Sequence, residues 1–132
     1  MLKTFSIRTS RRVEFINVTS HIERALSESG IANGILTVFV PHTTAAITIN
    51  ENADPDVMND ITGFINSAIP FNANYSHGEG NSAAHIKSSL FSPSLTIIVD
   101  EKEMLLGTWQ GIYFCEFDGP RTREFYVKVI AG

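Results

Sequence analysis

The segment that most limits the fold of this chain is Gly34–Val40, GILTVFV, an almost unbroken apolar run. Its branched and aromatic side chains favour an extended strand, and Pro41 marks its end. A strand that is apolar at successive positions is covered on both of its faces. The run therefore predicts a central strand of a layered sheet.

A second strand-like segment, Trp109–Phe117, shows the same property. Neither of its two alternating sets of side chains is polar throughout, so both faces are expected to be covered. Helices of the same chain can supply the second cover, and so can a neighbouring subunit. Because so little polar alternation occurs in 132 residues, the chain is a candidate for a closed oligomer.

The rest of the chain divides into short elements. Further strands are expected at Lys3–Arg8, Arg12–Val18, Thr43–Asn50, Ser94–Val99, Met104–Leu106 and Arg123–Ile130. Helices are expected from the Ser20–Glu23 capping spacing to Gly30, from Asp54–Pro55 to about Ser67, and from Asn81 to Leu90. Mostly sequential hairpins with three inserted helices predict one α+β domain over residues 1–132, with a mixed, largely antiparallel sheet.

Composition limits the cellular compartment and the kinds of partner that are expected for this chain. The chain is 43% hydrophobic and 18% charged, which is typical of a soluble globular protein, and no apolar run is long enough to span a membrane. The N-terminus lacks the apolar core of a signal peptide, which predicts a cytoplasmic location. A net charge of -4 argues against nucleic acid as a partner. The single cysteine, Cys115, lies in an apolar run and is expected to be a buried hydrophobe.

Three polar clusters follow strand-like runs, where binding sites tend to gather on a rigid sheet. In chain order they are His42 with Glu51, Asn52 and Asp54; His77 with Glu79, Asn81 and His85; and Gln110 with Glu116, Asp118 and Arg121.

Imidazole and carboxylate side chains in these clusters suit metal chemistry. Neutral imidazole is a good ligand for zinc, and His42, His77 and His85 can supply three ligands with one position left open. Glu79, and the pair of Glu51 and Asp54, can act as further ligands or as a general base beside a metal-bound water.

Each candidate also has a structural interpretation. Asp54 and Asn81 can serve as helix caps, and Arg121 can bind a phosphate or pair with Glu116 or Asp118. The remaining histidine, His21, is expected to be an exposed surface residue on a helix. The spacing of His77 and His85 matches no strong metal-binding signature.

Three long motifs, HTTAAITINENADPDV, YSHGEGNSAAHIKSSL and LGTWQGIYFCEFDGPRTR, together resemble the YjbQ family across nearly the whole chain. The family is named for a secondary thiamine-phosphate synthase activity. The resemblance implies an α+β sheet that is curled toward a sandwich or barrel, assembled as a homotrimer with polar pockets near the subunit contacts.

The implied activity is that of a transferase that joins a pyrimidine diphosphate to a thiazole phosphate and releases pyrophosphate. In this chain the implied catalytic residues are Glu51, Asp54, His77 and Glu79, and the implied substrate-binding residues are Asn52, Asn81, Gln110, Glu116, Asp118 and Arg121. A divalent metal, zinc or magnesium, is the expected cofactor. A metal-dependent hydrolase, a non-enzymatic module that binds a metal or metabolite, and polar clusters that only hold the trimer together are the alternatives.

Overall fold

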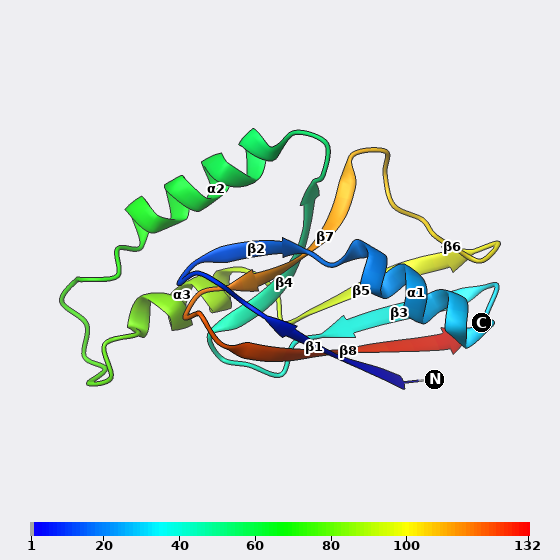
Figure 1. The fold of residues 1–132 in the computed structure, drawn as a ribbon, viewed down its shortest axis with the longest axis horizontal. Helices are drawn as coiled ribbons and strands as arrows, with labels where there is room; N and C mark the ends of the chain where they lie inside the picture. Colours follow the sequence, from blue (N-terminus) through cyan, green and yellow to red (C-terminus); the bar gives the residue numbers. More distant parts are fainter. Residues whose placement is uncertain (1) are drawn as a thin grey trace.

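Residues 2–132 are described by a computed structural model, and they form eight strands and three helices (Figure 1). Their order is β1 Leu2–Arg8, β2 Glu14–Asn17, α1 Thr19–Ser29, β3 Gly34–Phe39, β4 Ala45–Glu51, α2 Pro55–Ala68, α3 Ser82–Leu90, β5 Ser94–Asp100, β6 Glu103–Met104, β7 Gln110–Glu116 and β8 Thr122–Ala131. The expected elements are confirmed, with boundaries that differ by a few residues.

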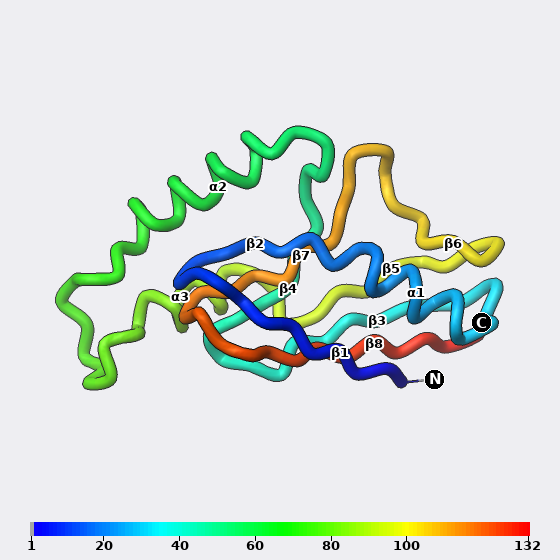
Figure 2. The backbone as a smooth tube through the Cα atoms, in the orientation of Figure 1, coloured from blue at the N-terminus to red at the C-terminus, as the bar shows by residue number. Residues whose placement is uncertain are grey.

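The strands form two sheets. The five-stranded sheet has the order β1-β8-β3-β5-β6 and the three-stranded sheet has the order β2-β7-β4. Every pairing among residues 2–132 is antiparallel, so the α+β class with a largely antiparallel sheet is confirmed. The expectation of sequential hairpins is wrong, because within this range β5 and β6 alone pair as consecutive strands. Figure 2 traces the backbone as it crosses from β7 in one sheet to β8 in the other.

The two sheets face each other across the main hydrophobic core. Leu36 and Val127 of the five-stranded sheet and Ile47 and Phe114 of the three-stranded sheet meet there, together with Ile22 of α1. Helices α2 and α3 lie at the end of the molecule opposite α1 (Figure 1). A smaller core beneath them joins the other face of the three-stranded sheet to these helices; it contains Ala46, Ile65, Ala84, Cys115 and Phe117.

This layering decides which strands are covered. In β7 every residue from Gly111 to Glu116 is buried, so the prediction that both faces of this segment are covered is confirmed within one chain. In β3 the prediction is wrong. Leu36 and Val38 face the core, but Ile35 and Phe39 on the opposite face are 48% and 45% exposed, because no element of residues 2–132 covers that face of the five-stranded sheet.

The helix termini show which sequence signals form as expected. Asp54 caps α2 by accepting a hydrogen bond from the backbone N–H of Asp56 at 2.9 Å, and Gly30 ends α1 in the left-handed conformation that glycine favours. Ser20 does not cap α1. The Asn17 side chain accepts the Thr19 N–H at 3.0 Å instead, one turn earlier than the capping-box spacing indicated.

Two further expectations concern single side chains. His21 is not an exposed surface residue, because its ring is half-buried edge-on against Phe5, with ring centroids 5.5 Å apart. Cys115 is fully buried as expected, and burial raises the pKa of its thiol well above the usual value, which disfavours the reactive thiolate. None of the helices in residues 2–132 is long and apolar enough to cross a membrane.

Candidate functional site

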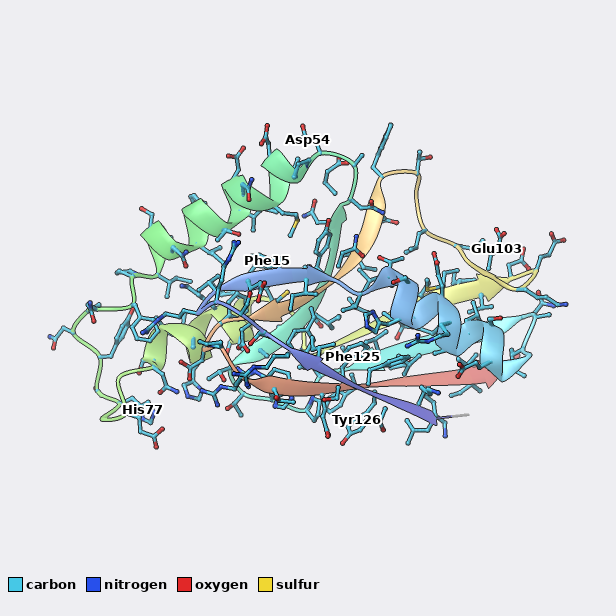
Figure 3. All side chains as sticks on the ribbon, viewed as in Figure 1. Phe15, Asp54, His77, Glu103, Phe125 and Tyr126 are labelled. Atoms are coloured by element: carbon cyan, nitrogen blue, oxygen red, sulfur yellow. The ribbon has the colours of Figure 1, made fainter. Side chains whose placement is uncertain are left out.

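The structure divides the predicted site between the two ends of the three-stranded sheet. Because β4 and β7 are antiparallel, Glu51 pairs with Gln110 at one end and Ala45 with Glu116 at the other. Seven-residue strands span about 20 Å, so the two ends are far apart. Figure 3 shows Asp54 and His77 at separate extremes of the molecule. Within one chain the predicted polar clusters therefore form two groups.

The first group, here called the Glu51 group, is Glu51, Asn52, Asp54 and Gln110. Much of its hydrogen bonding stabilises the local backbone: Glu51 Oε2 accepts the Ala53 N–H at 3.0 Å, and Gln110 Oε1 accepts the Gly107 N–H at 2.7 Å. Asp54, as described, caps α2. Asn52 and Gln110 also line a cavity of about 480 Å³. Those two amides are the members of the group that border this cavity.

Gly111 fixes the position of Asn52 in the Glu51 group. A Cβ atom added to Gly111 would lie 2.6 Å from the Asn52 Cβ, a distance that real structures do not show. Glycine is therefore required on β7 at the point where the Asn52 side chain crosses it.

The second group, here called the histidine group, is His77, Glu79, Asn81, His85, Asp118 and Arg121. The His77 and His85 rings lie edge to face with centroids 5.4 Å apart, and Glu79 Oε2 is 3.8 Å from His77 Nε2. The two imidazoles border a cavity of about 420 Å³ together with Tyr75 and Ser82. The loop and the start of α3 thus bring two imidazoles and a carboxylate together.

The third predicted metal ligand, His42, lies next to this group without completing a metal site. His42 and His85 both line a cavity of about 370 Å³. His42 Nε2 lies 3.0 Å from the backbone N and 3.1 Å from the backbone O of Glu124, so this ring nitrogen is already engaged. Burial, and then the charge of Arg123, lower the pKa of His42 and favour the neutral ring. Among residues 2–132 no three His, Cys, Asp or Glu side chains are close enough to hold a metal ion.

Asp118 connects the remaining members of the histidine group. Its Oδ2 accepts hydrogen bonds from Asn81 Nδ2 at 3.0 Å and from Arg121 Nη2 at 2.9 Å. Asn81 stands at the start of α3, but its side chain makes no capping bond there. Its Oδ1 is buried without a partner among residues 2–132. A buried acceptor without a donor is costly, so this atom marks a position where a donor from a ligand or water fits.

Glu116 lies beneath the histidine group, with no exposed surface. Its carboxylate accepts hydrogen bonds from Arg123, from the Thr9 hydroxyl at 2.8 Å and from the Asp118 N–H at 3.0 Å. Burial raises the pKa of Glu116, but these hydrogen bonds, led by that from Arg123, outweigh burial and leave its pKa below the usual value. A substrate would have to displace these partners to reach it.

Sequence reasoning missed Arg123, which pairs with Glu116 and also donates to Thr44 through Nη2 at 2.9 Å. Its position carried a signal, because Arg123 alternates in register with buried Phe125, Val127 and Val129 on β8. An arginine on the apolar face of a strand needs a buried carboxylate. Glu116 meets that need from β7, where it alternates with Ile112 and Phe114.

Comparison with known proteins identifies the relatives of this chain. Residues 3–132 match the family model described as UPF0047 protein YjbQ-like. A UPF0047 protein of Methanocaldococcus jannaschii is 58% identical over 130 residues, which cover 98% of this chain and 94% of that protein. The UPF0047 protein YugU of Bacillus subtilis is 51% identical over 131 residues, which cover 98% of this chain and 99% of that protein.

Solved structures show the same fold. The crystal structure of an uncharacterized conserved protein of the YjbQ/UPF0047 family from Clostridium acetobutylicum has a TM-score of 0.95 at 52% identity, covering 97% of this chain and 99% of that one. A hypothetical protein from Aeropyrum pernix has a TM-score of 0.95 at 37% identity, covering 100% of this chain and 99% of that one. The names of these four relatives state a family or no function at all, and none states an activity.

Proposed function

Because this chain belongs to the UPF0047 YjbQ-like family, we propose that it is a metal-assisted enzyme that acts on a phosphorylated small molecule at the histidine group. Thiamine-phosphate synthesis, in which a pyrimidine diphosphate and a thiazole phosphate join with release of pyrophosphate, is its secondary activity in this proposal. The carrying observation is the convergence of His77, His85 and Glu79 beside a cavity.

Three features of the histidine group support a phosphorylated substrate. Arg121 Nη2 lies 2.9 Å from Asp118 and is half-exposed, so its guanidinium can also reach an oxygen of a departing pyrophosphate. Asn81 presents a buried acceptor that lacks a donor, which suits a ring amine or hydroxyl of the substrate. Glu79 is largely exposed and its Oε2 lies 3.8 Å from Nε2 of His77, which borders the cavity, so its carboxylate can serve as a general acid or base next to that ring.

The metal part of the proposal does not fit the residues of a single chain. A catalytic zinc site uses three protein ligands, and His77 with His85 supplies two. His42 does not form a three-ligand group with them among residues 2–132, and Glu51 and Asp54 lie at the other end of the sheet. A single chain therefore offers two of the ligands that a catalytic metal needs, His77 and His85.

A homotrimer would let a neighbouring copy supply what is missing. Exposed apolar side chains on the outer face of the five-stranded sheet support an oligomer: Ile35, Phe39, Ile98 and Ile130 are all 45% exposed or more. Ile35 pairs in register with both Ile98 and Ile130, so three isoleucines form one row across three strands. A continuous apolar row of this kind favours burial against another chain.

The test measures turnover with the pyrimidine diphosphate and the thiazole phosphate, together with elemental analysis of the purified protein. We expect His77→Ala and Glu79→Gln each to reduce the rate at least 100-fold, the size of a general acid–base contribution, with the circular dichroism spectrum unchanged. Glu101→Gln, a matched change in the β5–β6 turn, controls for the loss of one carboxylate and should keep the wild-type rate.

Three outcomes separate the alternatives. Unchanged rates in both variants would reject the histidine group as the site. A non-enzymatic module predicts that an added ligand, tested with zinc and with the thiazole phosphate, stabilises the fold without consumption of substrate. Trimer contacts alone predict that His77→Ala lowers the mass measured by light scattering.

A further inference from the structure

Lys87 of α3 is a buried cation whose single hydrogen-bond partner among residues 2–132 is neutral. Its side chain is 2% exposed, and its Nζ donates a hydrogen bond to Asn66 Oδ1 of α2 at 2.7 Å. An ammonium group has three N–H donors, and no carboxylate pairs with it within residues 2–132. Lysine is almost never this buried unless it is paired. The two remaining donors of Lys87 thus call for an acceptor.

A second cation, Arg12, lines the same cavity. The cavity has a volume of about 300 Å³ and lies between Lys87, Arg12, Asn66 and Phe71. The guanidinium carbon of Arg12 lies 3.6 Å from the centroid of the Phe71 ring, which holds the side chain over an aromatic face. No carboxylate pairs with Arg12 in the part of the chain that the structure describes.

Such a cluster is unfavourable when nothing is bound to it. Burial, and then the charge of Arg12, lower the pKa of Lys87. The same protein shows how a buried charge is otherwise compensated, since Arg123 pairs with Glu116. The residues that line the cavity at Lys87 include no carboxylate, so no acidic side chain there neutralises the charges of Lys87 and Arg12.

We propose that Lys87, Arg12 and Asn66 form a binding site for the phosphate group of a small molecule or for free inorganic phosphate. Because Asn66 Oδ1 accepts the hydrogen bond from Lys87, the amide nitrogen of Asn66 remains as a further donor. The side chains thus offer donors from three residues and two positive charges. A phosphate group carries about -1.5 to -2 charges at pH 7 and accepts hydrogen bonds through several oxygens. Arg12 and Asn66 are exposed, so the site is open on their side and closed at Lys87.

This site is separate from the histidine group. Lys87 and His85 are two positions apart on α3, which places them about 200° apart around the helix axis. His85 borders the cavities shared with His77 and with His42, whereas Lys87 borders the cavity beneath α2. The inference therefore does not depend on the proposed function.

The test is a calorimetric titration of the full chain with inorganic phosphate, at constant ionic strength set with sodium chloride. We expect saturable binding at one site per chain in the wild type, and binding weakened at least tenfold in Arg12→Gln and in Lys87→Met. Arg11→Gln is the matched control. It removes the same charge from the neighbouring exposed residue and should change the dissociation constant less than twofold.

A second titration, with glycerol phosphate, separates the two sources of the ligand. Tighter binding of the ester indicates a phosphorylated metabolite, and tighter binding of the free ion indicates inorganic phosphate. The proposal is overturned if the wild type shows no saturable binding, or if Arg11→Gln weakens binding as much as Arg12→Gln does. Arg12 lies on the surface, so its variant keeps the test decisive if Lys87→Met does not fold. His77→Ala should bind phosphate at this site like the wild type, so failure here is distinct from failure of the proposed enzyme.

Discussion

Within residues 2–132, charged side chains are buried in two places, and an opposite charge compensates the burial in one of them. At Glu116 and Arg123, both 3% exposed or less, an acid and a base from β7 and β8 meet, and Thr9 and Thr44 satisfy further atoms. At Lys87, which is 2% exposed, one amide oxygen is the partner. Equal burial therefore does not imply an equal role. The first arrangement is closed to ligands, and the second has a cavity beside its unused donors.

The two sites also differ in what holds them in place. Glu116 and Arg123 lie within strands of the two facing sheets, so each side chain is positioned by a hydrogen-bonded ladder. Lys87 and Asn66 lie on α3 and α2, and α2 buries only Met58 and Ile65 among its fourteen residues. A helix with so few buried contacts opens more readily than a strand in a sheet core. Ligand access is therefore easier at Lys87 than at Glu116.

Breaking the compensated pair should give the largest effect. We expect Arg123→Met to lower the free energy of unfolding by about 3–5 kcal/mol, because it leaves the Glu116 carboxylate buried without its counter-charge. Urea denaturation measures this change. Arg8→Met, which removes an exposed arginine from β1, is the control and should cost less than about 0.5 kcal/mol. A similar small loss in both variants would contradict the assigned role of the pair.

Replacing Lys87 by methionine should raise the free energy of unfolding, the opposite of the effect expected at Arg123. We expect Lys87→Met, in a buffer without phosphate or sulfate, to raise the free energy of unfolding by about 1–2 kcal/mol, because an apolar side chain of similar length replaces an uncompensated buried charge. Arg11→Met, at an exposed position before β2, serves as the control and should be near neutral. A loss of stability as large as that of Arg123→Met would mean that Lys87 is structurally compensated after all.

The smallest effect is the pH dependence that follows from the lowered pKa of Lys87. The unfolded state holds this proton up to about pH 10.5, whereas the folded state releases it at lower pH. Between the folded and unfolded pKa values the unfolded state binds more protons, so the wild type gains stability as pH rises. The stability advantage of Lys87→Met should therefore shrink as the pH rises toward 10.5.

Urea denaturation of both proteins at several pH values measures this difference, since groups common to the two cancel. A difference that stays constant across the alkaline range would show that the pKa of Lys87 is ordinary.

The sequence predicted the elements of this fold better than their partners. Local signals such as Asp54 before Pro55, and Gly30 at the end of α1, depend on a few neighbouring residues and formed as expected. Strand pairing depends on residues far apart, and β1 with β8 is an example that no local pattern specifies. The prediction that both faces of β3 are covered failed for a similar reason. The apolar content of a strand does not show whether the layer that covers its second face belongs to the same chain.

For the candidate site too, the sequence predicted local clusters better than the way distant clusters come together. The short segment from His77 to His85 was predicted as one polar cluster, and the structure brings its two rings together. The prediction that Glu51 joins that cluster is not met within one chain, because Glu51 lies at the end of β4 that is far from the histidine group. Lys87 was missed because a lysine between Ile86 and Ser88 on a helix resembles an exposed residue until α2 is placed over it.

The position of β8 has a consequence for how this protein is made. Residues 122–131 lie between β1 and β3, so the two strands that flank them have no direct contact in the sheet. During synthesis, β1 and β3 leave the ribosome before β8, which pairs with an edge of each. More than eighty residues separate the end of β3 from the start of β8, so these edges stay unpaired until that length of chain has been made. Sheets closed by such distant segments form late and leave strand edges exposed to aggregation. We therefore expect nascent chains that stop before residue 122 to depend on chaperones, and full-length chains to be released from them.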